Sequence, residues 1–338
     1  MMANLVLGVD TGNKSLKIWG EFGSLVYSSG LVKARETESL LGKKDIDVIT
    51  IRSMKFDEEN KYYIGKDVLK MGDIIVTNIG EGRYRNKYFK ILTEGAIANA
   101  IKLSIENPSE EKHKVKIVTG LPSREKSAKS IEEELIKVLE GNHIVEVDGA
   151  EITFEVEVLR VVAQPLGTLF REILGNKRTG LTEKYVGIID CGGGTTDIDG
   201  IRELTVVDND RDTFPIGSYE VHQRVADFIN KENIYANANA SKVEEQFDSN
   251  SYRISDRASV DISKIKGEIT KGLSEELTNK IAVRWQNLTK FDIILLTGGS
   301  SSIYGEETKK LIEDIEIVAN SQLANAEGFY LYAMFLLE

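Results

Sequence analysis

The stretch VGIIDCGGGTTDI, residues 186–198, decides the fold class of this chain. An apolar run typical of a buried strand ends in Asp190, three glycines follow, and a second strand begins after two threonines. Glycine has no Cβ, so Gly192–Gly194 let the backbone turn tightly and approach a ligand closely. Successive N–H groups in such a turn form a concave anion site. The stretch therefore predicts a strand–turn–strand hairpin whose turn binds phosphate.

The same plan occurs near the N-terminus. In LGVDTGNKSLKI, residues 7–18, an apolar run ends in Asp10, a turn contains Gly12, and a second strand follows. Asp10 and Asp190 stand 180 residues apart. A second matched pair, A-x-x-x-G, occupies residues 163–167 and 324–328, and each copy opens an expected helix. This internal repeat predicts two similar lobes related by a pseudo-twofold, with a ligand in the cleft between them.

Both lobes are expected to be of the α/β class, because apolar strands alternate with amphipathic helical stretches. We place the first lobe at residues 1–170 plus 325–338 and the second at 171–324. Two polar, irregular stretches interrupt this pattern and are interpreted as inserted subdomains, at about 33–90 in the first lobe and about 220–265 in the second.

Composition excludes several classes of protein. The chain has 338 residues, 41% of them hydrophobic, which suffices for two cores. A net charge of −11 argues against direct binding of nucleic acid, which needs a basic face. The single cysteine, Cys191, rules out an intrachain disulfide and favours the cytoplasm. The apolar stretch 328–337 is too short to span a bilayer, and no signal peptide is expected at the N-terminus.

Carboxylates beside a phosphate site need a cation, because like charges repel. We expect Mg²⁺ held through its waters by Asp10 and Asp190. A third strand ends in glycines at ILLTGGSS, residues 294–301, where flat contact suits a purine or ribose. Each of these loops taken alone is also compatible with an ordinary turn, and their joint occurrence favours a nucleotide site. The predicted nucleotide-binding residues are Gly12, Asn13, Lys14, Gly192, Gly193, Gly194, Thr195, Thr196, Gly298, Gly299 and Ser300.

Gln164 ends an apolar strand and is a candidate catalytic residue together with Asp10 and Asp190. A neutral amide can orient a water for attack on a γ-phosphate, although a turn or helix-capping residue is an equally good interpretation. Glu327 is expected to be structural or to line the cleft, and Cys191 to be a buried packing residue. The histidines, His113, His143 and His222, lack metal-ligand spacing and are interpreted as surface or packing residues.

Taken in order, five motifs resemble those of the actin/sugar-kinase/heat-shock-chaperone superfamily. They are two phosphate motifs (LGVDTGNKSLKI and VGIIDCGGGTTDI), two connecting motifs (VVAQPLGTLF and ANAEGFYLYA) and an adenosine motif (ILLTGGSS). The resemblance is strongest to the ParM/StbA type of actin-like protein. Its signs are the pattern D-x-G-N-x-x-x-K, carried by Asp10, Gly12, Asn13 and Lys17, and the T-G-L-P at residues 119–122. Gln164 departs from this type, whose members can carry glutamate there, whereas actin carries glutamine.

The resemblance implies an actin-like fold, with two ribonuclease-H-like lobes around a nucleotide cleft. It also implies an ATPase that uses ATP and Mg²⁺, yields ADP and assembles with itself into dynamic helical filaments, with GTP as another possible substrate. Such proteins often segregate plasmids through a DNA-binding adaptor, which suits an acidic chain without membrane or nucleic-acid contacts of its own. The alternative is a non-polymerising small-molecule kinase or phosphotransferase of the same superfamily. A chaperone-like ATPase and a membrane-tethered filament protein fit less well, because neither a substrate-binding domain nor a basic terminal helix follows Gly328.

Overall fold

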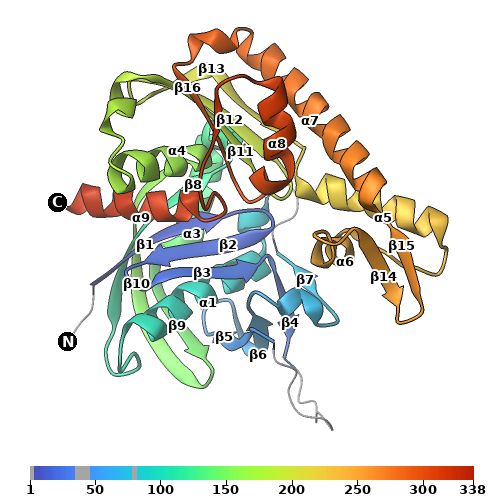
Figure 1. Ribbon diagram of the computed structural model, residues 1–338. Helices are drawn as coiled ribbons and strands as arrows, with labels where there is room; N and C mark the ends of the chain where they lie inside the picture. The colour runs from blue at the N-terminus through green and yellow to red at the C-terminus, as the bar shows by residue number, and fades with distance from the viewer. Residues whose placement is uncertain (1–3, 35–45, 78–81) are drawn as a thin grey trace. The chain divides into compact units, whose positions relative to one another are not determined.

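The computed structural model describes residues 4–34, 46–77 and 82–338 (Figure 1). The chain divides into two compact units. One comprises the residues up to Thr179 together with Leu323–Glu338, and the other is Gly180–Gln322. In the described residues each unit is built on one main sheet with helices packed against it, so the α/β class predicted from the sequence is confirmed.

The sheet of the first unit has the order β3-β2-β1-β8-β10-β9-β5-β6-β4-β7. Strands β1 and β2 form the predicted antiparallel hairpin, and β8 and β10 extend it on the other side of β1 as parallel neighbours. The strands are β1 (Asn4–Thr11), β2 (Ser15–Gly20), β3 (Gly23–Ser28), β4 (Gly30–Lys33), β5 (Ile49–Ser53), β6 (Asp57–Ile64), β7 (Ile75–Val76), β8 (His113–Leu121), β9 (Gly141–Val147) and β10 (Ala150–Ala163).

The segment expected as an inserted subdomain, about 33–90, contributes β5 and β6, which join the same sheet through β9. Its residues 35–45 and 78–81 lie outside the described residues. Helix α1 (Lys87–Ser104) covers part of the sheet, and Asn86 begins it by accepting a hydrogen bond from Tyr88 N at 2.9 Å. The helix expected over 123–141 is two helices, α2 (Ser123–Lys126) and α3 (Lys129–Leu139).

The paired A-x-x-x-G motifs lie where two helices of the first unit cross. These are α4 (Gln164–Phe170) and α9 (Ala324–Leu337), which lie beside each other in Figure 1. A Cβ at Gly328 would stand 1.7 Å from Gly167 O, so the two backbones touch. Thr168 Oγ1 donates to Asn325 Oδ1 at 2.9 Å across the same crossing. The motif is therefore a helix-packing device, with glycine required for the approach.

The sheet of the second unit has the order β13-β12-β11-β16-β17. It repeats the pattern of β3-β2-β1-β8-β10, because two antiparallel pairs are followed by two parallel pairs in both. The internal repeat seen in the sequence is thus a repeat of sheet topology. The strands are β11 (Tyr185–Cys191), β12 (Thr196–Arg202), β13 (Thr205–Phe214), β16 (Ile293–Thr297) and β17 (Ile315–Ile317).

Three longer helices accompany this second sheet: α5 (Ser218–Glu232), α7 (Ser263–Trp285) and α8 (Ser301–Leu311). The expected insertion, about 220–265, contains α6 (Ala240–Glu245) and a separate hairpin of β14 (Ser251–Ser255) and β15 (Ala258–Asp261). These elements have their own apolar cluster, which includes Val225, Ile229, Val243, Tyr252 and Ile262. Short helical turns complete the described chain at η1 (Val68–Lys70), η2 (Arg83–Arg85), η3 (Arg171–Gly175), η4 (Thr179–Glu183) and η5 (Leu288–Lys290). None of the helices in the described ranges is long and apolar enough to cross a membrane.

Candidate functional site

The carboxylate of Asp10 is the centre of the candidate site in the first unit. Asp10 is 2% exposed near the end of β1 and has two side-chain donors. Lys17 Nζ lies 2.8 Å from its Oδ2, and Gln164 Nε2 donates to its Oδ1 at 3.1 Å. Burying a carboxylate is costly unless a counter-charge and hydrogen bonds compensate it. Two of the predicted catalytic residues are therefore in direct contact, and Lys17 joins them.

Lys17 belongs to the pattern D-x-G-N-x-x-x-K, but the pattern alone indicated no role for its side chain. Its position follows from the hairpin register, in which Asp10 pairs with Lys17 across β1 and β2. Directly paired residues of two antiparallel strands have side chains on the same face of the sheet. The register of the predicted hairpin was the signal that could have identified this ion pair.

The turn between β1 and β2 contains the predicted phosphate ligands Gly12, Asn13 and Lys14. It is held by neighbours from later in the chain. Ser29 N donates to Lys14 O at 2.9 Å, Ser29 Oγ donates to Gly12 O at 3.3 Å, and the Arg83 guanidinium donates to Asn13 Oδ1. Lys14 itself is exposed at the turn.

Arg83 is the site residue that sequence reasoning missed. Its guanidinium is 4% exposed and also reaches Glu125 Oε2 at 3.2 Å, so it links the β1–β2 turn to α2. Arg83 lies 70 residues from Asn13 in the sequence, in a segment without a phosphate motif. No local pattern could have indicated this contact.

In the second unit, Asp190 is 6% exposed near the end of β11, and the glycine loop follows it. The first turn of α5 supports this loop, because Ser218 N donates to Gly192 O at 3.4 Å and Tyr219 N donates to Gly193 O at 2.9 Å. Across a trans peptide, a C=O and the next N–H point in opposite directions. Gly193 and Gly194 therefore direct their N–H groups away from α5, which is the orientation that an anion site requires.

The loop TGGSS packs directly against this glycine loop. Gly298 has φ +89°, and a Cβ there would stand 2.3 Å from Asp190 Oδ1. Ser300 N donates to Cys191 O at 2.8 Å, and Ser300 Oγ donates to Gly192 O at 2.7 Å. The structure thus brings Gly298 and Ser300 together with Asp190 and Gly192. The Ser300 hydroxyl supports the loop, while a Cβ at Gly299 would make only an ordinary contact, 3.6 Å from Gln322 Cγ.

The two threonines of the loop differ in their surroundings. Thr196 is fully buried and its Oγ1 donates to Ile216 O at 2.7 Å, so its hydroxyl supports the fold. Thr195 is partly exposed at the turn. Cys191 is buried, and burial raises the pKa of its thiol to about 12, which makes it a packing residue and not a nucleophile.

The remaining predicted side chains have structural surroundings. All three histidines are buried, with His143 Nδ1 2.9 Å from Glu94 Oε1 and His222 against the Phe247 ring. Glu327 accepts a hydrogen bond from Arg171 Nε at 2.5 Å within the first unit.

A metal held by protein ligands alone is not supported. Over residues 4–34, 46–77 and 82–338, no group of three or more His, Cys, Asp or Glu side chains is placed to hold a metal ion. The predicted Mg²⁺ needs fewer protein ligands, since it is held through waters and phosphates. The buried carboxylates of Asp10 and Asp190, each beside a phosphate-type turn, fit such water-mediated binding, and the magnesium site stays a prediction.

A hairpin turn of this kind in each of two α/β units with matching sheet topology is typical of actin-like proteins. Residues 8–167 match the family model described as "Actin like proteins N terminal domain", and residues 185–330 match that described as "Alp7A C-terminal domain". The chain therefore belongs to the actin-like proteins, and the resemblance stated from its motifs is confirmed. No curated protein sequence matches it.

Solved structures confirm the predicted actin-like fold. The apo psk41 ParM protein is 22% identical with a TM-score of 0.76, the alignment covering 99% of this chain and 98% of that one. Ta0583, an archaeal actin homologue, is 20% identical with a TM-score of 0.80 and coverage of 98% and 99%, and it was also solved in complex with ADP. A 15-stranded ParM filament from Clostridium botulinum is 17% identical with a TM-score of 0.77 and coverage of 99% and 100%.

Proposed function

We propose that this chain is a polymerising actin-like ATPase, which binds ATP, assembles with itself into dynamic filaments and disassembles after hydrolysis. The observation that carries the proposal is the presence of one phosphate-type hairpin in each unit of a chain that belongs to the actin-like proteins. Relatives of the same fold include a ParM filament and an archaeal homologue solved with ADP, which supports both self-assembly and a nucleotide ligand.

In this proposal the two turns bind the phosphates of the nucleotide. The N–H groups of Gly193 and Gly194, which point away from α5, would donate to the phosphates, and Thr195 would add a hydroxyl. Gly12, Asn13 and Lys14 supply backbone and side-chain donors from the first unit. Asp10 and Asp190 would hold Mg²⁺ through water, and when bound the ion would neutralise charge on the phosphate oxygens. Gly298 and Gly299 offer a flat surface for the nucleoside, and GTP remains an alternative to ATP.

The hydrolytic role falls to Gln164. Its Nε2 donates to Asp10, so the amide is held in one orientation and its Oε1 is left as the acceptor that can orient a water. A positioned water is what γ-phosphate hydrolysis requires. Lys17 keeps the Asp10 carboxylate compensated and in place between the two strands. Asp10 is thus both the expected metal-orienting group and the support for Gln164.

The biological role that fits best is plasmid or other DNA segregation in the cytoplasm. The net charge of −11 disfavours direct contact with DNA, so we propose a DNA-binding adaptor protein as the link to the cargo.

Light scattering combined with sedimentation tests the proposal. Purified protein with Mg²⁺ should assemble on addition of ATP, remain assembled with a non-hydrolysable analogue and disassemble as ATP is consumed. Protein that stays monomeric with every nucleotide while still consuming ATP would refute self-assembly and favour a small-molecule kinase.

A further inference from the structure

A turn of the second unit, directly after α5, presents two large apolar side chains to solvent. Ile234 and Tyr235 follow α5 and are 76% and 81% exposed. The backbone of this turn is fixed by asparagine side chains. Tyr235 N donates to Asn233 Oδ1 at 3.0 Å, and Asn230 both accepts from Ala238 N at 2.8 Å and donates to Ala238 O at 2.9 Å. An ordered turn loses little further conformational entropy on binding, so it is suited to docking.

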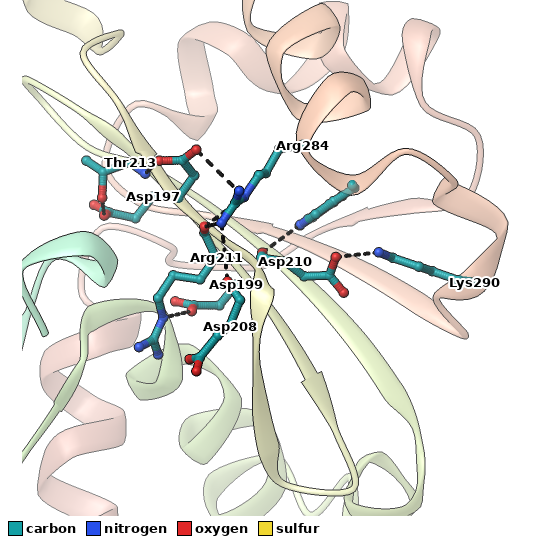
Figure 2. Close-up of polar contacts among 10 residues, drawn as sticks. Asp197, Asp199, Asp208, Asp210, Arg211, Thr213, Arg284 and Lys290 are labelled. Atoms are coloured by element: carbon teal, nitrogen blue, oxygen red, sulfur yellow. Dashed lines mark hydrogen bonds and ion pairs between the residues drawn. The ribbon is translucent and has the colours of Figure 1, made fainter. Parts of the chain in front are cut away.

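A groove of about 930 Å³ lies against β13 and the end of α7. Val283, on its lining, is 79% exposed. Tyr235, Val283 and Ile234 are the three most exposed large hydrophobic side chains of the described residues. The wall of the groove is braced by polar contacts (Figure 2). Arg284 donates to the carbonyl oxygens of Asp208 and Arg211, and Lys290 pairs with Asp210. The groove is therefore a formed surface with an apolar contact point.

The groove lining and the segment around the turn carry formal charges of opposite sign. The groove lining has four cationic side chains against two carboxylates, a formal charge of +2, from Arg202, Lys280, Arg284, Lys290, Asp210 and Asp212. Residues 227–250 around the turn have two lysines against five acidic residues, a formal charge of −3, from Lys231, Lys242, Asp227, Glu232, Glu244, Glu245 and Asp248. Two copies of a chain with a net charge of −11 repel each other in most orientations. The opposite charges of turn and groove favour the orientation in which the turn of one copy faces the groove of another.

Turn and groove cannot meet within one molecule. Ile265 and Ile269, near the start of α7, pack against the apolar cluster below the turn, whereas Trp285 at the end of α7 lines the groove. Twenty residues of helix separate Ile265 from Trp285, which is about 30 Å. Figure 1 shows α7 running between these two parts of the second unit. Two different surfaces of opposite charge on one compact unit give a head-to-tail contact. Such a contact propagates without closing when the repeat does not form a ring.

We propose that the Ile234–Tyr235 turn of one copy docks into the groove around Val283 of the next copy. The inference rests on the proposed self-assembly and names its contact surfaces. Tyr235 is the anchor, since an exposed aromatic residue on an ordered turn loses the most water-accessible apolar area on docking.

Three variants test this contact by sedimentation with Mg²⁺ and a non-hydrolysable ATP analogue. Ile234→Asp/Tyr235→Asp removes the anchor, Val283→Asp alters the groove, and Leu103→Asp is the matched control, because Leu103 is 57% exposed on α1. The first two should raise the critical concentration at least tenfold while nucleotide binding and the thermal midpoint stay unchanged. An equimolar mixture of the two defective variants should form heterodimers and stop there, since each retains one intact surface.

Cross-linking identifies the partner surface. Tyr235→Cys and Val283→Cys proteins, treated with a short bis-maleimide under assembly conditions, should give a dimer in the mixture and little with either alone. Native Cys191 is fully buried and does not compete. Three outcomes would overturn the contact while leaving self-assembly intact. They are a cross-linked dimer from Tyr235→Cys alone, an unchanged critical concentration for both aspartate variants, and an equal loss of assembly in the Leu103→Asp control. A wild-type protein that never assembles would refute the proposed function as well.

Discussion

Gln164 Nε2 donates to Asp10 Oδ1 at 3.1 Å, although 154 residues separate the two in the sequence. The same carboxylate accepts from Lys17 Nζ at 2.8 Å through its other oxygen. Asp10 thus ties the end of β10 and the start of α4 to the β1–β2 hairpin. A change at Gln164 should therefore affect the orientation of the attacking water. A change at Lys17 should instead lower the stability of the folded protein, because the buried Asp10 carboxylate loses its counter-charge.

We expect Gln164→Ala to lower kcat for ATP hydrolysis by about 100-fold. The reason is that the variant loses the acceptor proposed to orient water, while the residues proposed to bind phosphate are intact. Nucleotide affinity, measured with a fluorescent ATP analogue, should change by less than about threefold. Gln223→Ala on α5 is the control and should leave turnover as in the wild type. Unchanged turnover in Gln164→Ala would remove Gln164 from the mechanism.

Lys17→Met and Lys14→Met separate a structural lysine from a ligand-binding one. Lys17→Met leaves the Asp10 carboxylate buried without its counter-charge and should cost about 3 kcal/mol of unfolding free energy. Lys14 is exposed at the turn, so Lys14→Met should keep the stability and weaken nucleotide binding. Urea denaturation and nucleotide titration of both variants check this. Equal stabilities of the two variants would contradict the assignment.

Gly328→Ala should destabilise the first unit by at least about 3 kcal/mol, because its Cβ would stand 1.7 Å from Gly167 O and force α4 and α9 apart. Gly272→Ala in α7 is the matched control. No heavy atom lies within 4 Å of a Cβ there, and alanine favours a helix over glycine by about 1 kcal/mol, so it should stabilise the protein. Thermal melts of the two variants should shift in opposite directions.

The carboxylate of Asp57 makes the stability of the first unit depend on pH. Burial alone would raise the pKa of Asp57, but hydrogen bonds from Tyr62, Asn60 and Lys87 outweigh it and hold the pKa at about 2. The ionised form is favoured in the folded state. Its contribution is therefore complete above the ordinary pKa of about 3.9 and is lost as the pH falls toward 2.

Asp57→Asn should remove this contribution. We expect the variant to be about 1 to 2 kcal/mol less stable than the wild type at pH 6, with the difference shrinking between pH 4 and pH 2. Denaturant titrations across this range measure it. A difference that stays constant with pH would show that Asp57 acts through packing and not through its charge.

Local patterns were sufficient for the fold class and for most of the candidate site. The alternating apolar runs and glycine turns around Asp10 and Asp190 predicted both hairpins, because strand pairing across a short turn depends on neighbouring residues. The repeated A-x-x-x-G predicted two helix starts. The sequence alone did not show that the second helix start, Ala324, belongs to a helix that packs on the first, because packing depends on the path of the whole chain between them.

By itself, the sequence determined the two hairpins, their phosphate-type turns and the family to which the chain belongs. Only the tertiary structure decided that Arg83 donates to Asn13, that Gly298 packs on Asp190, and that Val283 and Tyr235 are exposed at two separate parts of one unit. The physical reason is the separation in sequence between the residues that interact. Turns and strand periodicity are set by residues a few positions apart, whereas a buried guanidinium contact or an exposed apolar surface results from segments that only folding brings together.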